Sequence, residues 1–372
     1  MKKPHLESTY KLFINGEWKE ASDKATYKSY CPANGEVLAE CAQATREDVE
    51  DAITAAWDAF ETWKNVPVNE RAEILNKVAD IIDENREHLA MVETLDNGKP
   101  IRETLNVDIP MAAQHFRYFA GCIMASEGSA NILGKDTLSL ILREPIGVVG
   151  QIVPWNFPFL MAAWKLAPVL ASGCCTVFKP SSSTSLSVLE LARLVQGVIP
   201  RGVFNVITGS GSKSGQYMLE SKRFRKLAFT GSTEVGRNVA LAAAERIIPA
   251  TLELGGKSAN IFFEDCDWEM AMDGLQMGIL FNQGQVCCAG SRVFVQDSIY
   301  DRFVEEAVKR FNAVKVGLPW ESDTQMGCQI SKRQMEKILG YVEIGKKEGA
   351  KVLCGGVQDT EGELKNGCFL RP

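Results

Sequence analysis

The sequence contains few histidines and no cysteines at the spacing of a metal or redox motif. None of the eleven cysteines forms a Cys-x-x-Cys, and the three histidines are scattered, which argues against a Cys/His metal site and leaves an all-carboxylate site open. The cysteine count is odd and two pairs are directly adjacent, a pattern that does not suit a disulfide framework. We therefore expect no bound metal, and free thiols in a reducing, cytoplasmic compartment. The residues concerned are His5, His88, His115, Cys174, Cys175, Cys287 and Cys288.

Long uninterrupted apolar runs are also missing. The longest apolar stretches, 146–153 and 157–171, are broken by Pro, Gly, Lys or Asn and fall short of the roughly 18 apolar residues that suggest a membrane span. Residues 1–10 are polar and do not resemble a secretory signal. The formal net charge is only −6, which argues against a protein that grips nucleic acid or anionic membrane. We expect a soluble protein that binds neither.

The composition is that of an ordinary globular protein. The 372 residues are 45% hydrophobic and 24% charged, which excludes a disordered chain and allows a large core. At roughly 150 residues per domain, this length predicts two or three domains. We find neither a tandem repeat nor a low-complexity linker.

Hydrophobic periodicity predicts an α/β fold. The first part of the chain is predicted to be mostly helical: Thr45 and Asp48 resemble a capping box before a helix that runs to Trp63, and a second helix is expected over 69–97. From Thr137 onward, short strands alternate with helices, which is typical of βαβ units around a parallel sheet. The predicted strands are 137–143, 146–153, 175–178, 204–207, 226–229, 250–254, 258–263 and 292–296. The predicted helices are 160–170, 187–198, 235–246, 268–281 and 299–314.

Two glycine-rich loops follow predicted strands. The loop 209–215 has one residue too many for Gly-x-Gly-x-x-Gly, and no acidic residue ends a following strand, so a plain strand-to-helix turn is favoured over a dinucleotide fingerprint. The loop 231–236 lacks the Lys and Ser/Thr of a phosphate loop. It still places a flexible turn at a helix N-terminus, where backbone N–H groups and the helix dipole favour phosphate. A phosphate site and a purely structural turn both remain open for it.

Three further segments carry polar chemistry in unusual settings. Cys287 and Cys288 lie in a polar, glycine-flanked turn, where a thiol is more reactive than in a core, although a buried structural cysteine is the common case. Glu253 ends a predicted strand before two glycines, where a solvated carboxylate is the default. Asn156 is bracketed by aromatic residues and prolines, which suits either a rigid turn or a fixed amide donor.

Taken in order, these segments resemble the aldehyde dehydrogenase family. The similarity extends from Phe13 to the last residue, and it rests on the segments 154–158, 178–181, 229–236, 253–258 and 282–288. The resemblance implies an α/β fold with a Rossmann-like nucleotide-binding domain, a second α/β catalytic domain and a β-hairpin oligomerisation element. We expect the cofactor-binding domain at 1–124 and 146–255, the hairpin at 125–145 and the catalytic domain at 256–372. Since the family continues past the position of Pro372, we expect the catalytic domain to be incomplete here, and the full-length form to be a homodimer or homotetramer.

The resemblance also implies the catalytic residues. Cys287, rather than Cys288, would be the nucleophile that converts an aldehyde to a thiohemiacetal and then to a thioester. The side-chain amide of Asn156 and the backbone N–H of Cys287 would hold the oxyanion. Glu253 would be the general base for hydrolysis of the thioester, which argues against transfer of the acyl group to coenzyme A.

For the cofactor, the resemblance implies NAD or NADP. Lys179 would hold the adenosine ribose, Ser232 the pyrophosphate and Gly211 the adenine, which gives the loop 209–215 a role. The remaining residues implied in cofactor binding are Ile152, Val153, Pro154, Trp155, Gly231, Gly236 and Leu254. Many NAD-preferring members carry Glu where this chain has Ser182. Its absence removes repulsion against a 2′-phosphate, to which Ser181 and Ser182 could donate hydrogen bonds, so we expect NADP to be accepted with NAD still usable.

The implied substrate tunnel is apolar, which predicts aliphatic or aromatic aldehydes over cationic ones such as betaine aldehyde. Its residues are Phe157, Leu160, Met161, Trp164 and Phe281. Two alternatives remain open: a catalytically impaired member that keeps cofactor binding or esterase activity because the C-terminal part is missing, and an enzyme with acylating or esterase chemistry that uses the same thiol.

Overall fold

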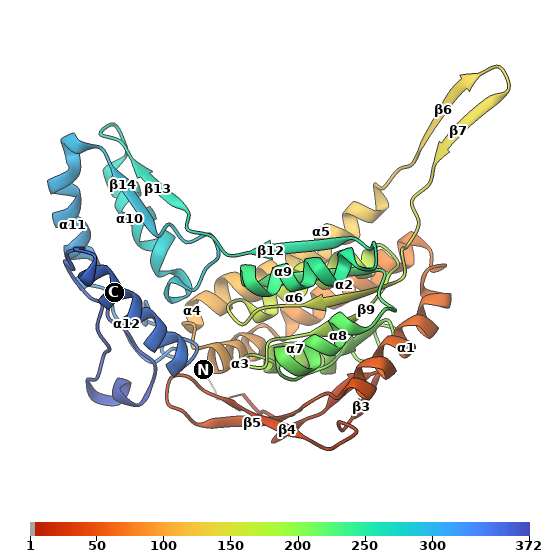
Figure 1. The fold of residues 1–372 in the computed structure, drawn as a ribbon, viewed down its shortest axis with the longest axis horizontal. Helices are drawn as coiled ribbons and strands as arrows, with labels where there is room; N and C mark the ends of the chain where they lie inside the picture. Colours follow the sequence, from red (N-terminus) through yellow and green to blue (C-terminus); the bar gives the residue numbers. More distant parts are fainter. Residues whose placement is uncertain (1–3) are drawn as a thin grey trace.

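A computed structural model describes residues 4–372 and is built around a seven-stranded sheet (Figure 1). Five parallel strands lie in the order β12-β11-β8-β9-β10, and two short antiparallel strands, β2 and β3, extend the sheet beyond β10. Their bounds are β2 Leu12–Ile14, β3 Glu17–Lys19, β8 Val148–Ile152, β9 Cys175–Lys179, β10 Phe204–Val206, β11 Lys226–Gly231 and β12 Ala250–Leu254. The strand order reverses at β8, which has β9 on one side and β11 on the other. Such a switch point leaves a crevice at the carboxyl ends of the strands, where α/β proteins bind ligands.

Helices cover this sheet and join its parallel strands, as the alternation of strands and helices predicts. The helix α1 packs against β8, β9 and β10, whereas α6 packs against β9 and α9 against β11 and β12. The bounds are α1 Arg46–Trp63, α6 Pro158–Ala171, α7 Leu186–Leu194, α8 Gln216–Glu220 and α9 Thr233–Ala244. The capping box of α1 is confirmed, since Thr45 and Asp48 bond each other's backbone N–H groups.

The prediction of a mostly helical first part is wrong for residues 9–42. These residues form β2 and β3 and a separate sheet of β1 (Thr9–Tyr10), β5 (Val37–Ala42) and β4 (Thr26–Tyr30). The strands are short and do not alternate cleanly between buried and exposed residues, so the signal of period two is weak. The predicted helix over 69–97 is two helices, α2 (Val68–Glu84) and α3 (Arg86–Asn97), because Asn85 leaves the helical conformation and its side-chain amide donates to the Ile81 carbonyl.

Two adjoining segments complete the larger body. A short helix, α4 (Ile101–Glu103), continues through a π-helical turn (Thr104–Asp108) into α5 (Ile109–Met124), which packs on α2 and α6. The hairpin of β6 (Ser129–Gly134) and β7 (Thr137–Ile141) then projects from the body as an isolated arm (Figure 1). Almost every hairpin residue is exposed.

A smaller lobe follows β12. Its two parallel strands, β13 and β14, pack against α10 and α11 around a small cluster that includes Phe262 and Phe303. The bounds are β13 Ala259–Phe262, α10 Trp268–Leu280, β14 Arg292–Val295, α11 Tyr300–Asn312 and α12 Lys332–Lys347. The last part of the chain returns to the larger body, where Cys328 and Phe369 belong to the main core.

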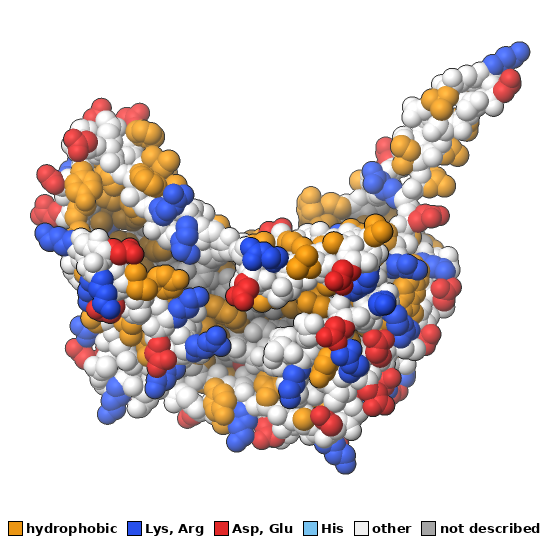
Figure 2. Space-filling view, in the orientation of Figure 1, with side chains coloured by type: hydrophobic (Ala, Val, Ile, Leu, Met, Phe, Trp, Pro, Cys, Tyr) orange, Lys and Arg blue, Asp and Glu red, His pale blue; other side chains and the backbone are white. Residues whose placement is uncertain are grey.

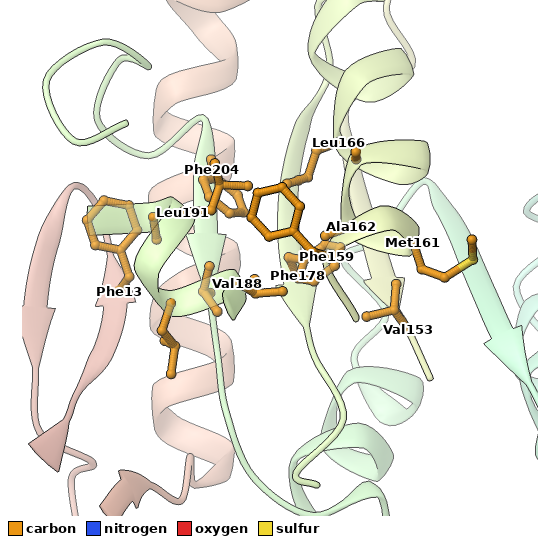
Figure 3. Packing of buried hydrophobic residues seen from close by; sticks show 14 of the residues in the cluster. Phe13, Val153, Phe159, Met161, Ala162, Leu166, Phe178, Val188, Leu191 and Phe204 are labelled. Carbon is orange, nitrogen blue, oxygen red and sulfur yellow. The ribbon is translucent and has the colours of Figure 1, made fainter. Parts of the chain in front are cut away.

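The main core lies beneath the carboxyl ends of the sheet. Figure 3 shows Phe159 of α6 beside Phe178 of β9, with Val153 and Met161 to the right of them. The ring centroids of Phe178 and Phe204 lie 6.3 Å apart. Because this layer is fully buried, the loop 153–157 above it has a fixed base.

Residues 4–372 contain neither a membrane-spanning helix nor a cluster of metal ligands. No helix there is long and apolar enough to cross a membrane. Within the same range, no group of three or more His, Cys, Asp or Glu residues is arranged to hold a metal ion.

Candidate active site

The predicted nucleophile follows a sharply turned loop. The helix α10 ends at Leu280, and three successive residues, Asn282, Gln283 and Gly284, have left-handed backbones with φ of 48°, 55° and 76°. Only glycine adopts this conformation without a steric penalty, so each of the two others costs about 1–3 kcal/mol unless its surroundings compensate. Both Asn282 and Gln283 are buried, which is where compensating contacts are made.

Asn156 is bonded directly to this loop. Its side-chain Nδ2 donates to the carbonyl of Gln285 at 2.9 Å, and its own carbonyl accepts from Asn282 Nδ2 at 2.6 Å. The backbone of the neighbouring Trp155 is held as well, because its carbonyl accepts from Asn97 Nδ2 at 2.7 Å. The side-chain amide of Asn156 is therefore held against Gln285, which precedes Cys287 by two residues. The second N–H of this amide remains available to another acceptor.

The thiol and the candidate base approach the same place from different elements. Glu253 lies near the end of β12, and at Gly256 a Cβ atom would lie 3.3 Å from the Cys287 carbonyl oxygen, so the two segments are in close contact. Cys287, Cys288 and Glu253 are all exposed. Burial raises the pKa of the Cys287 thiol, and the adjacent Cys288 adds to this effect. The free chain thus presents Cys287 as a thiol, and a base or a bound positive charge must help to remove its proton.

The predicted cofactor residues gather at the switch point of the sheet. Ile152 of β8 pairs with Lys179 of β9, and the Val153 N–H donates to the Lys179 carbonyl at 3.2 Å. The Lys179 side chain is buried, and burial lowers its pKa to about 8. Its ammonium has three N–H donors, and one of them meets the Pro180 carbonyl at 3.0 Å. Pro154 and Trp155 continue from β8 and are half-buried.

The start of α9 lies beside this group. Ser232 caps the helix by accepting from the Val235 N–H, and Gly231 pairs with Leu254 across β11 and β12. Gly236 packs closely on Leu254, since a Cβ atom there would lie 2.5 Å from its Cδ2 atom and the Leu254 side chain would have to shift.

The other two predicted cofactor segments lie in neighbouring turns. Gly211 opens a π-helical turn (Gly211–Gly215) with free space around it, and Ser181 and Ser182 are half-buried in the turn after β9.

The predicted tunnel residues are not all alike. Phe157 and Phe281 stack with their ring centroids 5.9 Å apart, which joins the segment after β8 to the end of α10. Leu160 and Met161 are buried on α6. Trp164 differs, because it is 43% exposed and stacks on His115 of α5.

Known proteins match this chain over nearly its whole length. The model of the aldehyde dehydrogenase family matches residues 18–372. The chain belongs to the aldehyde dehydrogenase family. It is 49% identical to aldehyde dehydrogenase B of Escherichia coli over 99% of this chain, and 49% identical to acetaldehyde dehydrogenase of Pseudomonas aeruginosa over 98%. In both cases the match spans 73% of the relative.

Solved structures agree with this assignment. The NAD⁺ complex of aldehyde dehydrogenase from Bacillus cereus matches with a TM-score of 0.96 and 43% identity, over 100% of this chain and 77% of that one. A second structure, described as a putative aldehyde dehydrogenase from Burkholderia cenocepacia, gives a TM-score of 0.97 at 40% identity and covers 98% of this chain and 75% of its own. The predicted α/β aldehyde dehydrogenase fold is therefore confirmed. The family is one of NAD(P)-dependent oxidoreductases, and relatives of known structure bind NAD⁺.

Several residues at this aldehyde dehydrogenase site are missing from the sequence-based predictions. Lys165 of α6 is buried, which lowers its pKa to about 8, and the charge of Glu253 acts against this shift. Gln283 and Gln285 bond the segment 328–330, since Gln283 Nε2 donates to the Cys328 carbonyl at 2.9 Å and Gln285 Oε1 accepts from the Ile330 N–H at 3.1 Å. The polar run 282–285 beside the cysteines was a usable signal for the two glutamines.

Glu103 and Lys99 were missed as well, and no comparable signal marked them. They follow a segment that reads only as the end of a helix.

Proposed function

We propose that this chain oxidises a small aldehyde to a carboxylic acid with NAD(P), through a thiohemiacetal and a thioester on Cys287. The observation that carries the proposal is the direct bonding of Asn156 to the carbonyl of Gln285. This contact supports a fixed amide donor beside the turn that leads to the thiol. The family membership supports the same reaction class.

In the proposed reaction, the Sγ of Cys287 attacks the aldehyde carbon as its thiol proton leaves to a base or to water. The free N–H of Asn156 and the backbone N–H of Cys287 then hold the oxyanion. When bound, oxidised nicotinamide supplies an acceptor for the hydride that leaves the former aldehyde carbon, and a thioester remains on Cys287. Glu253 takes a proton from the water that attacks this thioester, which frees the acid and returns the thiol.

The residues at the switch point fit a dinucleotide. Lys179 offers two buried N–H donors that the protein's own contacts leave available, which suits ribose hydroxyls or a phosphate. The first turn of α9 after Ser232 supplies backbone N–H groups and a favourable dipole for the pyrophosphate. Ser182 in place of a carboxylate supports use of NADP as well as NAD.

The substrate we propose is a small aliphatic aldehyde, with aromatic aldehydes as a second choice and betaine aldehyde disfavoured. Phe157, Leu160, Met161 and Phe281 supply apolar walls, and the relative from Pseudomonas aeruginosa is named for acetaldehyde. A cationic aldehyde would have to leave water without a carboxylate among these residues.

Assembly and location are further parts of the proposal. We assign 1–124 and 146–255 to cofactor binding, 125–145 to an oligomerisation hairpin and 256–372 to catalysis. Ile132, Leu138 and Leu140 on the projecting arm are largely exposed, and they support a homodimer or homotetramer in which a partner covers them. The eleven free thiols suit a reducing cytoplasm.

The test pairs two cysteine variants. Cys287→Ser should lower acetaldehyde-dependent NADH formation by about a thousandfold or more, because serine lacks a comparable nucleophile. The matched control, Cys288→Ser, should keep the rate within about threefold of the wild type, since the role of nucleophile falls to its neighbour alone. Absorbance at 340 nm measures both, and hydrolysis of p-nitrophenyl acetate is followed beside it.

Three results would count against the proposal. A larger loss of NADH formation in Cys288→Ser than in Cys287→Ser would assign the role of nucleophile to Cys288. Ester hydrolysis without NADH formation in the wild-type chain would support the esterase alternative. Binding of NAD without either activity would support the catalytically impaired alternative.

A further inference from the structure

The turn before Cys287 rests on a buried carboxylate that the proposed chemistry does not use. Glu103 Oε2 accepts the backbone N–H of Asn282 at 2.9 Å, and Glu103 is 4% exposed. Glu103 ends α4, 179 positions before Asn282 in the chain. A single hydrogen bond therefore ties the N-terminal helical region to the first left-handed residue of the loop.

This contact differs from the other anchors of the loop. Gln283 and Gln285 are held by the segment 328–330 through neutral amides and backbone groups. Glu103 is the acceptor for the N–H of Asn282, at the point where α10 stops and the backbone turns left-handed. Above its pKa of about 7, Glu103 is a carboxylate, and a hydrogen bond to a carboxylate is stronger than one to a neutral oxygen, so Glu103 is well suited to hold a conformation that the chain would otherwise leave.

The surroundings of Glu103 supply its counter-charge. Lys99 is fully buried, pairs with Asp108, and its Nζ lies 3.7 Å from the centroid of the Phe157 ring. Burial raises the pKa of Glu103 to about 7, and the charge of Lys99 and the Asn282 N–H oppose that rise. Glu93 of α3 sits in the same group and accepts from the Phe159 N–H at 3.3 Å. Glu93 thus bonds the start of α6, close to Asn156, and Glu103 bonds the loop before Cys287.

We infer that Glu103 is a positioning residue for residues 281–288, which we call the catalytic loop. Its carboxylate holds Asn282 in the left-handed conformation that presents Cys287 opposite the amide of Asn156. The inference rests on the proposed function, because it assigns the consequence to catalysis by Cys287. Glu103 itself touches neither thiol nor substrate. Its effect passes through Asn282, whose side chain in turn bonds the Asn156 carbonyl.

Two substitutions separate this role from general stabilisation. Glu103→Leu removes the acceptor, whereas Glu103→Gln keeps a side-chain oxygen that can still accept from Asn282. Glu190→Leu is the matched control, because Glu190 is equally buried but bonds Tyr10, His88 and Arg193, and none of these residues lies in the catalytic loop.

The measurements are hydrogen–deuterium exchange of the peptide covering 281–288, and kcat and KM for acetaldehyde and NAD. In Glu103→Leu we expect loop exchange to accelerate about tenfold, and kcat to fall by about tenfold or more with the KM for NAD changed less than twofold. Glu103→Gln should recover kcat to within about threefold of the wild type. Glu190→Leu should leave loop exchange and kcat close to wild-type values.

Several outcomes would overturn the inference. Unchanged loop exchange in Glu103→Leu would do so, as would equal damage in the Gln and Leu variants or an equal effect in the Glu190 control. The exchange measurement also separates this inference from the proposed function. If the wild-type chain forms no NADH, the proposed function fails, while faster loop exchange in Glu103→Leu alone still shows that Glu103 holds the loop.

Discussion

At the scale of a single residue, our proposal assigns the choice between NAD and NADP to Ser182. It lies half-buried in the turn three residues after the buried Lys179, so a carboxylate there would stand close to the proposed ribose site. We predict that Ser182→Glu weakens the binding of NADP by about tenfold to a hundredfold, because the new charge repels a 2′-phosphate. The KM for NAD should stay within about threefold of the wild-type value.

The matched control for this change is Ser183→Glu, which adds the same charge one residue further on at an exposed position. Initial rates with NAD and with NADP, measured for both variants, give the ratio of kcat/KM for the two cofactors. The prediction is wrong if Ser182→Glu leaves this ratio unchanged, or if Ser183→Glu shifts it by as much.

Site residues in local motifs can be proposed from the sequence, whereas residues that act through distant contacts cannot. Asn156 and Cys287 stand in short segments whose composition is unusual on its own, and the fold brings those segments together. Glu103 has no such local mark. Its proposed role rests on one bond to a residue 179 positions away, and only the tertiary fold creates that bond.

At the scale of elements, the projecting hairpin exposes an apolar face. Ile132 pairs with Leu138 and Ala130 with Leu140, so these side chains share one face, and Ile132 is 83% exposed. Figure 2 shows hydrophobic side chains along this arm, away from the body. An isolated two-stranded hairpin is marginally stable in water, so a partner surface would stabilise it as well as hide its apolar face.

We predict that Leu138→Lys converts an oligomer of this chain to a smaller species, because the charge must be desolvated when a partner covers this face. Asn131→Lys is the control, since Asn131 lies on the opposite face of the same hairpin and is also exposed. Light scattering coupled to size-exclusion chromatography gives the mass of each variant. Equal masses for wild type and Leu138→Lys would show that this face is not an interface.

Helices and strands with a strong hydrophobic periodicity could be predicted from the sequence, and those that depend on their neighbours for stability could not. Apart from α8, which no predicted helix covers, the helices and parallel strands from β8 to α11 match their predicted positions to within a few residues at most ends, because βαβ units carry clear apolar patterns. Strands β1 to β5 were missed, since each is short and takes its stability from the sheet it joins. The break at Asn85 was missed because the apolar stripe continues on both sides of it.

At the scale of the whole molecule, the two apolar clusters are very unequal. The larger one extends from the first strands to Phe369, whereas the buried cluster of the smaller lobe consists of Phe262, Met272, Leu275 and Phe303. The catalytic loop lies where these bodies meet, because it leaves α10 of the smaller lobe and bonds Asn156 and Glu103 of the larger one. The larger body therefore contributes the fixed frame, and the loop depends on contacts to that frame for its shape.

This frame contains four buried carboxyl groups with raised pKa values, Glu93, Asp96, Glu103 and Asp108, and they make the stability of the molecule depend on pH. Burial raises the pKa of Glu93, Asp96 and Glu103 to about 7, above the value of roughly 4 expected in an unfolded chain. The folded state therefore binds more protons than the unfolded state between about pH 4 and pH 7. In that window the free energy of unfolding should rise as the pH is lowered, and the gain should be lost as the pH rises through 7.

The other shifted groups act outside this window. Glu190, whose pKa is lowered to about 2 by its bonds to His88 and Arg193 against the effect of burial, loses its contribution only below about pH 4.5. Burial lowers the pKa of Lys165 and Lys179 to about 8, so their contribution changes above neutral pH. The direction between pH 5.5 and pH 7.5 is therefore set by the buried carboxyl groups with raised pKa values.

We predict that the urea concentration at half-unfolding is higher at pH 5.5 than at pH 7.5, with a difference in the free energy of unfolding of about 1–3 kcal/mol. Glu93→Gln removes one titrating group without changing its size, so it should make the pH dependence shallower. Glu84→Gln, at the end of α2 and exposed, should not. A midpoint that falls from pH 7.5 to pH 5.5 would mean that these carboxyl groups are ionised in the folded chain, with Lys99 and the backbone N–H groups of Phe159 and Asn282 outweighing the effect of burial.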